Sequence, residues 1–296
     1  MIEYWNWRYG KQPVLAGPEN GARLMKILIV AAVLLAASAF NAYSQETVAL
    51  VKYGGNLKKI AVSIEGKPYW FLFDSGAGET IISPELARLL NKQVYGSVTG
   101  YRHTGEKFMY QLCDGVSIKI GGAAIPHETL GVYDLMSFLP KGAPKIDGVI
   151  SLKTFQGRIL SIDLGANKLT LETKKSAKKK ERHMAPVTSR FATGPDGSQL
   201  DIFTAIRREG KLYWFLLDTG NLQPVLVSSH VARDWGLAVE PASTSTARMM
   251  DIAFGKGTDA VAFSVDDMIY DGMLSFDFIS KKVLLLDLGK KQMWAE

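Results

Sequence analysis

Cysteine and histidine are scarce in this chain of 296 residues, which contains one cysteine and four histidines. Because Cys113 is the only thiol, no intramolecular disulfide and no cysteine-ligated metal cluster can form. None of the histidines has the spacing of a zinc-binding motif. We therefore expect no metal and no cofactor, and an apolar core in place of a disulfide framework.

The chain also lacks a basic face that is spread over the folded protein. Its formal net charge is +6, but residues 174–182 hold six lysines and arginines against Glu181 alone, which leaves +5 in one short segment. The remainder is close to neutral, so nucleic-acid binding is not predicted. Residues 173–186 are interpreted as a solvated, mobile basic linker, and binding to anionic lipid or cell-wall polymer is the less favoured alternative.

No apolar run is long enough for a comfortable membrane span, which needs ~20 residues. The longest run covers residues 27–37 and extends to Phe40, and Met25-Lys26 precede it. Ala42 and Ser44 then supply small residues at the −3 and −1 positions of a cut before Gln45. This pattern is typical of a secretory signal peptide over residues 25–44, and a membrane anchor is the alternative. Residues 1–24 resemble neither a signal nor a domain, so we interpret them as an upstream misread start. We expect an exported bacterial protein, periplasmic or secreted, with no stable membrane insertion after signal removal.

The most informative feature of the sequence is an internal repeat. Residues 65–76 read EGKPYWFLFDSG and residues 209–220 read EGKLYWFLLDTG, at a constant offset of 144. In each copy an apolar strand and a Glu-Gly turn precede a second strand that we expect to be buried on both faces, Trp70 and Trp214 included. That strand ends at an aspartate. A third short strand then leads into a short helix that begins at Ser83 or Ser228.

A second repeated unit follows later in each half. Residues 146–151 read IDGVIS and residues 270–275 read YDGMLS, and each is followed by a strand, a glycine-containing turn and another strand. The chain is therefore predicted to be a tandem duplication of a β-rich unit. The expected lobes are residues 45–172 and 187–296.

The two repeated aspartate motifs resemble the active-site motifs of pepsin-like and retropepsin-like aspartic proteases. A lone Asp-Ser-Gly is more often a simple turn, but two copies in matched repeats are a specific signal. The resemblance implies an all-β fold with short helices, the two-lobed aspartic protease (acid protease) barrel. It also implies that Asp74 and Asp218 are the catalytic pair. The residues expected to support the two loops are Ser75, Gly76, Ala77, Thr80, Thr219 and Gly220.

Such a pair would give an aspartic endopeptidase. Two neighbouring carboxyl groups in a poorly solvated site share one proton, so one can act as a base on water while the other polarises the scissile carbonyl. By resemblance, the Ser75 and Thr219 hydroxyls lock the two loops together, and Gly76 and Gly220 let the backbone approach the carboxyl groups. We expect a monomer that acts on peptides or proteins.

A flap is expected over the cleft of the first lobe. The candidate is the hairpin-like stretch 98–110, which would bring Thr99, Gly100, Tyr101 and Arg102 near substrate. An ordinary exposed hairpin is the alternative.

Four residues depart from the family pattern: Ser151, Ser275, Asn221 and Pro224. They motivate a second hypothesis, a catalytically inactive relative that binds peptide or glycan in the same cleft. A third hypothesis is a structural envelope protein tethered through the basic linker.

Overall fold

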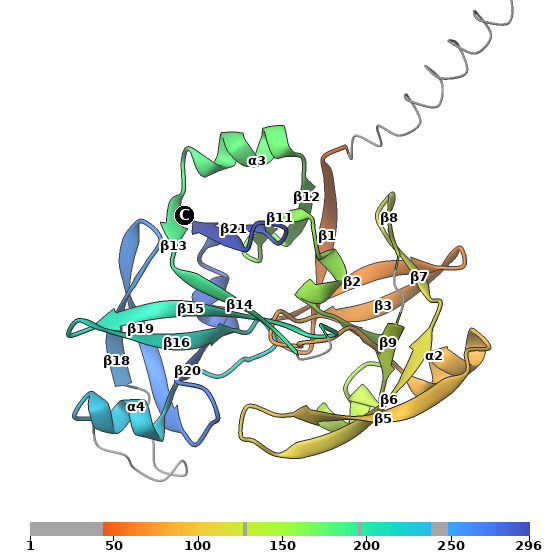
Figure 1. Ribbon diagram of the computed structural model, residues 1–296, viewed down its shortest axis with the longest axis horizontal. Helices are drawn as coiled ribbons and strands as arrows, with labels where there is room; N and C mark the ends of the chain where they lie inside the picture. The colour runs from red at the N-terminus through yellow and green to blue at the C-terminus, as the bar shows by residue number, and fades with distance from the viewer. Residues whose placement is uncertain (1–43, 127–128, 195–196, 238–247) are drawn as a thin grey trace, which may run out of the picture. The chain divides into compact units, whose positions relative to one another are not determined.

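The computed structural model describes residues 44–126, 129–194, 197–237 and 248–296. The predicted upstream segment, residues 1–24, and the predicted signal peptide, except Ser44, lie outside the described residues. Strands dominate the described part, with a few short helices, and they form two lobes (Figure 1). Among these residues no helix is long and apolar enough to cross a membrane.

The first lobe contains most of the strands of a 15-stranded sheet. Its strands are β1 (Glu46–Tyr53), β2 (Leu57–Ile64), β3 (Lys67–Phe73), β4 (Ile81–Ile82), β5 (Val94–Tyr101), β6 (Lys107–Asp114), β7 (Ser117–Ile120), β8 (Ala123–Pro126), β9 (Thr129–Val132), β10 (Gly148–Ile150), β11 (Ile159–Asp163) and β12 (Lys168–Glu172). Its helices are α2 (Pro84–Leu89) and the 3-10 turns η1 (Leu135–Phe138) and η2 (Leu152–Phe155).

The second lobe is built around a 7-stranded sheet in the order β14-β15-β16-β20-β17-β19-β18. Its strands are β13 (Ala185–Val187), β14 (Ser189–Thr193), β15 (Leu200–Arg208), β16 (Lys211–Leu217), β17 (Val225–Ser228), β18 (Arg248–Phe254), β19 (Gly257–Asp266), β20 (Gly272–Leu274), β21 (Val283–Asp287) and β22 (Gln292–Ala295). Its helices are α4 (Ser229–Asp234) and α5 (Phe276–Ile279).

The sequence repeat appears as a repeated structure. The hairpins β2–β3 and β15–β16 turn through the Glu-Gly pairs, and Glu65 and Gly66 have positive φ of 53° and 78° as a tight hairpin turn requires. The predicted helix starts are also observed, since the Ser83 hydroxyl accepts from the Leu86 N–H and the Ser228 hydroxyl from the Val231 N–H. The duplicated β-unit predicted from sequence is therefore present in both lobes.

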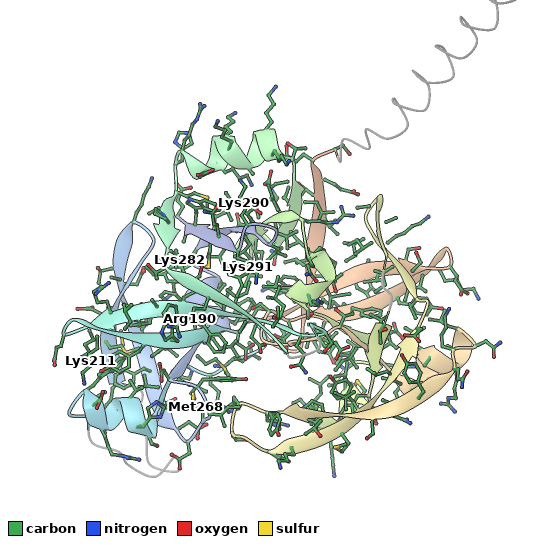
Figure 2. All side chains as sticks on the ribbon, in the orientation of Figure 1. Arg190, Lys211, Met268, Lys282, Lys290 and Lys291 are labelled. Carbon is green, nitrogen blue, oxygen red and sulfur yellow. The ribbon has the colours of Figure 1, made fainter. Side chains whose placement is uncertain are left out.

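The central strand of each copy is less buried than predicted. Phe71 and Phe73 of β3 are fully buried, but Trp70 is 39% exposed and lies under the Lys59 ammonium, 4.4 Å from the ring centroid. Trp214 of β16 is half-buried, with the Arg190 guanidinium 3.7 Å from its ring centroid. Figure 2 labels Arg190 on the second-lobe sheet. The expectation that both tryptophans belong to the core is wrong, because each ring is partly exposed and packs against a cationic side chain.

The two lobes share one sheet. Strands β13, β22, β21, β11, β12 and β1 are consecutive neighbours, and β11 pairs antiparallel with β21 so that Ser161 faces Leu285. The strands that follow the second repeated unit in each half thus join the two halves. This pairing fixes one lobe against the other and so positions the two repeated aspartate loops.

The basic segment between the lobes is a helix and not the mobile connector predicted from its charge. Helix α3 (Lys174–Glu181) begins with a capping box formed by Thr173 and Ser176. Lys180 forms an ion pair with the buried Glu172 carboxylate at 2.7 Å, and Ala177 is buried. One face of the helix is anchored in this way, and its other cationic side chains are exposed to solvent. The segment is therefore an ordered helix despite its charge.

Candidate active site

Each repeated aspartate lies where its central strand ends and is held by the crossing strand of the same lobe. Strands β10 and β20 run parallel to β3 and β16. The Asp74 N–H donates to the Ile150 carbonyl at 3.0 Å, and the Asp218 N–H donates to the Leu274 carbonyl at 3.1 Å. The Asp-Gly-apolar-apolar units that follow each motif in sequence therefore support the aspartates from behind.

The two loops are joined by reciprocal hydrogen bonds. The Ser75 N–H donates to the Thr219 hydroxyl at 2.9 Å, and the Thr219 N–H donates to the Ser75 hydroxyl at 3.0 Å. Each hydroxyl in turn donates across the interface, Ser75 to the Leu217 carbonyl and Thr219 to the Phe73 carbonyl. Both side chains are buried, so each lobe fixes the loop geometry of the other.

The glycine after each hydroxyl residue packs against the aspartate of the opposite lobe. A Cβ on Gly76 would lie 2.4 Å from the Asp218 Cγ, and a Cβ on Gly220 would lie 2.5 Å from an Asp74 carboxyl oxygen. Only glycine leaves room for this approach. The structure thus brings Asp74 and Asp218 together, each against the backbone of the other's loop.

Burial dominates the electrostatics of the pair. Loss of water raises the pKa of Asp74, while backbone N–H donors such as that of Gly76, at 2.9 Å, oppose the rise. Burial and then the charge of Asp74 raise the pKa of Asp218 well above its ordinary value, against the Gly220 N–H at 2.7 Å. The two groups therefore titrate as one unit that retains a proton more readily than isolated aspartates do.

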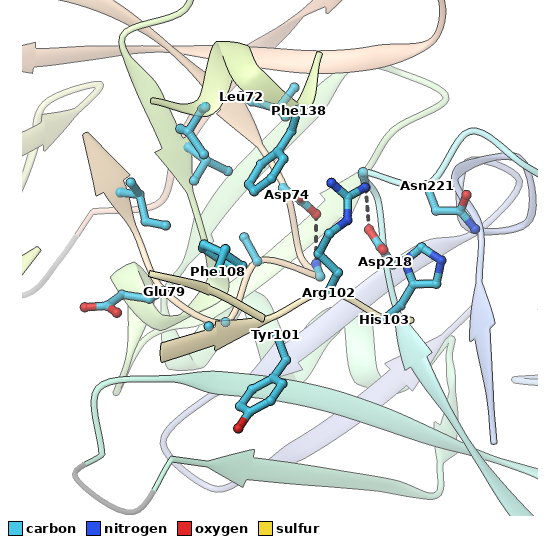
Figure 3. A pocket seen from close by; sticks show the side chains of 18 of the residues that line it. Leu72, Asp74, Glu79, Tyr101, Arg102, His103, Phe108, Phe138, Asp218 and Asn221 are labelled. Atoms are coloured by element: carbon cyan, nitrogen blue, oxygen red, sulfur yellow. Dashed lines mark hydrogen bonds between the residues drawn. The ribbon is translucent and has the colours of Figure 1, made fainter. Parts of the chain in front are cut away.

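The pair opens into a cavity of about 700 Å³ between the lobes. Figure 3 shows Asp74 and Asp218 beside each other, with residues of the β5–β6 hairpin in the same cavity. The first lobe contributes an apolar wall, formed by Leu57, Leu72, Ile81, Ile146 and Val149. The second lobe contributes several polar side chains. In the described ranges, no three His, Cys, Asp or Glu side chains are grouped so that they could hold a metal ion.

The stretch predicted as a flap is a β5–β6 hairpin at this cavity. Gly100, Tyr101 and Arg102 line it, and Tyr101 is 54% exposed. Thr99 does not line it, because its hydroxyl donates to the Met109 sulfur on the exposed face of the hairpin. Gly100 is required by packing, since a Cβ there would lie 2.4 Å from the Phe108 ring.

The tip of the hairpin reaches the second lobe. The Ile269 N–H donates to the His103 carbonyl at 2.9 Å, and the His103 Nε2 lies 3.6 Å from an Asp266 carboxyl oxygen. Figure 1 shows the yellow hairpin meeting the blue segment that precedes β20. The hairpin therefore spans the cavity from one lobe to the other, a contact that the sequence did not predict.

Removing this contact is expected to loosen the hairpin. The Asp266→Asn substitution should accelerate hydrogen exchange of the Ile269 amide about 1.4- to 5-fold, because partly exposed pairs of this kind contribute ~0.2–1 kcal/mol. The neighbouring Asp267→Asn change, at an exposed position, serves as the control. Equal exchange rates in both variants would show that the side-chain contact does not hold the tip.

The four sequence departures have different structural settings. In the first lobe the buried Thr80 hydroxyl accepts from the Ser151 N–H at 3.1 Å and bonds the Thr154 hydroxyl. Ser151 caps η2 through the Lys153 N–H at 3.1 Å, so a serine suits this position. In the second lobe Pro224 replaces Thr80, and Ser275 makes no side-chain capping bond. Ala77, by contrast, packs against the apolar wall.

Asn221, beside the second aspartate loop, carries an unpaired donor. Its side-chain oxygen accepts from the Gln223 N–H at 2.9 Å, while its buried Nδ2 has no acceptor within the part of the chain that the structure describes. Asn221 also lines the cavity.

Besides the pair and Glu79, which accepts a hydrogen bond from the Tyr110 hydroxyl, the cavity is lined by a carboxyl group that sequence reasoning missed, that of Asp201. Burial raises its pKa to about 6. The neighbouring Tyr270 has a pKa raised to about 12 by burial and then by the charges of Asp201 and Asp218. The repeat held a signal for this residue, because the position 144 residues earlier is Leu57, and a charge in place of a buried leucine is unexpected.

Ionised Asp201 is expected to destabilise the fold. The folded state holds the Asp201 proton more tightly than the unfolded state does. Ionisation of Asp201 therefore leaves the free energy of unfolding unchanged below pH 3.8 and lowers it by about 3 kcal/mol above pH 6. The Asp201→Asn variant should therefore be more stable than the parent at pH 8 and equally stable at pH 3, measured by urea unfolding. An exposed control, Asp251→Asn, should show no such pH-dependent gain. A gain of equal size at both pH values would contradict this origin.

Comparison with known proteins agrees with this geometry. A family model described as aspartyl protease matches residues 60–154, which include Asp74 but not Asp218. A search of curated protein sequences found no match.

Solved structures with a similar fold include one named as an aspartic proteinase and two named as basic 7S globulins. An aspartic proteinase from Irpex lacteus is 13% identical, with a TM-score of 0.52 over 85% of this chain and 97% of that one. Basic 7S globulin from soybean is 8% identical (TM-score 0.56; 86% and 96% covered), and conglutin gamma, a basic 7S globulin from lupine seeds, is 10% identical (TM-score 0.54; 85% and 94% covered). The described part of the chain therefore has an aspartic protease-like fold, as predicted.

Proposed function

We propose that this protein is an aspartic endopeptidase that uses Asp74 and Asp218 to hydrolyse peptide bonds. The observation that carries the proposal is the meeting of two partly buried carboxyl groups, one from each lobe, in a cavity between the lobes. Their loops are joined by the reciprocal Ser75 and Thr219 hydrogen bonds, which give the fixed geometry that general acid–base catalysis needs. The aspartyl protease match over residues 60–154 adds support.

The proposed reaction follows from one proton shared by the pair. The ionised carboxylate takes a proton from a water molecule, whose oxygen attacks the scissile carbonyl carbon. The protonated carboxyl group gives its proton to the carbonyl oxygen, forming a neutral tetrahedral diol. The first carboxyl then returns a proton to the amide nitrogen, the C–N bond breaks, and the second carboxyl recovers its proton from the diol. The products are a carboxylic acid and an amine.

A second candidate is a silent relative that binds peptide or glycan in the same cavity. The observation in its favour is the altered second loop, where Asn221 and Pro224 stand in place of the residues Ala77 and Thr80 of the first loop. Two structures with a similar fold are named as seed globulins and not as proteinases. The tethered envelope protein has weaker support, because the basic segment is an ordered helix.

Cleavage of a mixed peptide library by the full chain between about pH 3 and pH 8 tests the proposal. We expect turnover with a rate that falls at both extremes, since one carboxyl of the pair must be protonated and the other ionised. Cleavage in water enriched in oxygen-18 should place one label in each new carboxyl group, as direct attack by water requires. A folded protein that binds library peptides but cleaves none at any pH would favour the silent relative.

We also propose that the protein is exported from a bacterial cell, to the periplasm or beyond, and acts there as a monomer. The signal-like pattern of residues 25–44 supports export, and the presence of both aspartates in one chain supports a monomer. N-terminal sequencing of the mature protein should give Gln45 as the first residue.

A further inference from the structure

The two halves of the cavity differ at positions that the repeat makes equivalent. Leu57 begins β2 and belongs to an apolar cluster with Leu72 and Val149 on the first-lobe side. The hairpin registers of β2–β3 and β15–β16 share the 144-residue offset, so Leu57 corresponds to Asp201 at the start of β15. Both side chains line the cavity. The cavity is therefore apolar on one side and acidic at the matching place on the other.

The Asp201 carboxyl group has no partner in the described part of the chain. No hydrogen bond or ion pair joins its side chain to any described residue, although the backbone beside it is fixed by the Leu200 N–H, which donates to the Gly78 carbonyl at 2.8 Å. A Cβ on Gly78 would lie 3.2 Å from an Asp201 carboxyl oxygen, so this glycine leaves space beside the carboxyl group. A partly buried carboxylate without a partner is costly, which makes the site ready for a cation.

Cations of the protein that line the same cavity are engaged elsewhere. The Arg102 guanidinium lies 4.8 Å from the Phe138 ring centroid and 3.7 Å from a Glu106 carboxyl oxygen. His103 lies beside Asp266. Neither neutralises Asp201, which leaves its carboxyl group, as far as the described residues go, open to a cationic group of a ligand.

We propose that Asp201 forms a subsite that selects substrates with a lysine or arginine side chain next to the scissile bond, opposite an apolar side chain held by the Leu57 cluster. This inference rests on the proposed function, since it assigns the substrate class of the same cleft. Asp201 lies beside the loop that follows Asp74, since a Cβ on Gly78 would lie 3.2 Å from its carboxyl oxygen, and it lines the same cavity as Asp74 and Asp218. An ammonium or guanidinium group would gain a charged hydrogen bond there that a neutral side chain cannot make.

Selection for a cation should depend on pH. With a pKa of about 6, Asp201 is ionised at pH 7.5 and mainly protonated at pH 4.5. Tyr270, which feels its charge, stays protonated throughout this range. Preference for the cation should therefore be strong at pH 7.5 and weak at pH 4.5.

The test compares peptides that differ at one position only, lysine against the uncharged norleucine, placed in turn on each side of the scissile bond. For the full-length parent at pH 7.5 we expect kcat/KM to favour lysine about 10- to 100-fold on one side, as a charged hydrogen bond implies. The Asp201→Leu variant, which copies Leu57, should reverse the preference, and Asp201→Asn should abolish it. The exposed Asp251→Asn variant is the charge-matched control and should retain it.

Two results would overturn the proposal. The first is an unchanged lysine preference in Asp201→Leu. The second is an equal loss of kcat/KM for the lysine and norleucine peptides, as expected if Asp201 contacts only the substrate backbone. A binding measurement separates this failure from failure of the proposed function. Calorimetry measures the affinity of lysine and norleucine peptides whose scissile amide is replaced by a hydroxyethylene group, so that binding at the subsite is measured without catalysis. If the parent binds the lysine peptide selectively, Asp201→Leu removes this selectivity and no peptide is cleaved, the subsite is supported and the peptidase function is refuted. Binding without selectivity for lysine would refute the subsite.

Discussion

The Asp74→Asn and Asp218→Asn variants are each expected to lose at least about 10³-fold of the peptidase activity of the parent. Each substitution keeps the shape of the side chain but removes a group that must gain or lose a proton, and a positioned acid or base contributes about 10²–10⁴-fold. Because the two groups work as one unit, the double variant should be no less active than either single variant. The measurement is kcat/KM for a peptide found in the library, between pH 3 and pH 8.

Stability distinguishes a lost catalyst from a lost fold. Burial and the charge of Asp74 raise the pKa of Asp218, so the parent should lose stability as pH rises from the ordinary aspartate value through the raised one. Asparagine does not titrate, and Asp218→Asn should be at least as stable as the parent at neutral pH. Exposed Asp251→Asn should keep both activity and pH dependence. Full activity in either dyad variant would refute the proposed mechanism.

The Gly220→Ala substitution is expected to lower activity at least about 100-fold without touching a titratable group. Its new Cβ would lie 2.5 Å from one Asp74 carboxyl oxygen and 2.7 Å from the Asp74 Cγ, so Asp74 must move. A displacement on the order of 1 Å at reacting groups costs about 10²-fold. Gly76→Ala should act equally through Asp218, where the distance to Cγ is 2.4 Å.

Gly257→Ala provides the matched control, because a Cβ there meets nothing within 4 Å and its φ is not positive. It should leave kcat and KM unchanged. The loss in Gly220→Ala should fall on kcat and be accompanied by a changed pH profile, since the carboxyl pair would be separated. A parent-like profile with full kcat would show that the close approach is dispensable.

The repeat carried most of what could be predicted. Two copies of one strand-turn-strand pattern specified the hairpins, the helix starts at Ser83 and Ser228, and the loops that meet at Asp74 and Asp218. Local signals suffice there because turns, caps and buried strands are set by neighbouring residues. The fold class follows from the same pattern.

The features that the sequence did not reveal depend on distant partners. Apolar strands such as β11 and β21 have no local mark that says which strand pairs with them, so the shared sheet was missed. Helix α3 was hidden by its charge, although Thr173 and Ser176 were in place for its cap. The repeat already aligned Asp201 with Leu57, but the proposed role of Asp201 became visible only when the structure placed both residues in one cavity.

The shared sheet also dictates when the pair can form during protein synthesis. A nascent chain that has been translated past Asp218 contains both aspartates, but it still lacks β21, whose Asp287 pairs with Ile159 of β11. Pairing between segments so far apart in sequence is slow, because a long loop must close first. Docking of the lobes is therefore a late step, and a partly made chain cannot align its carboxyl groups. Any hydrolytic activity of the pair therefore begins only after β21 has been synthesised. An incomplete chain on the ribosome cannot cleave its own unfolded segments.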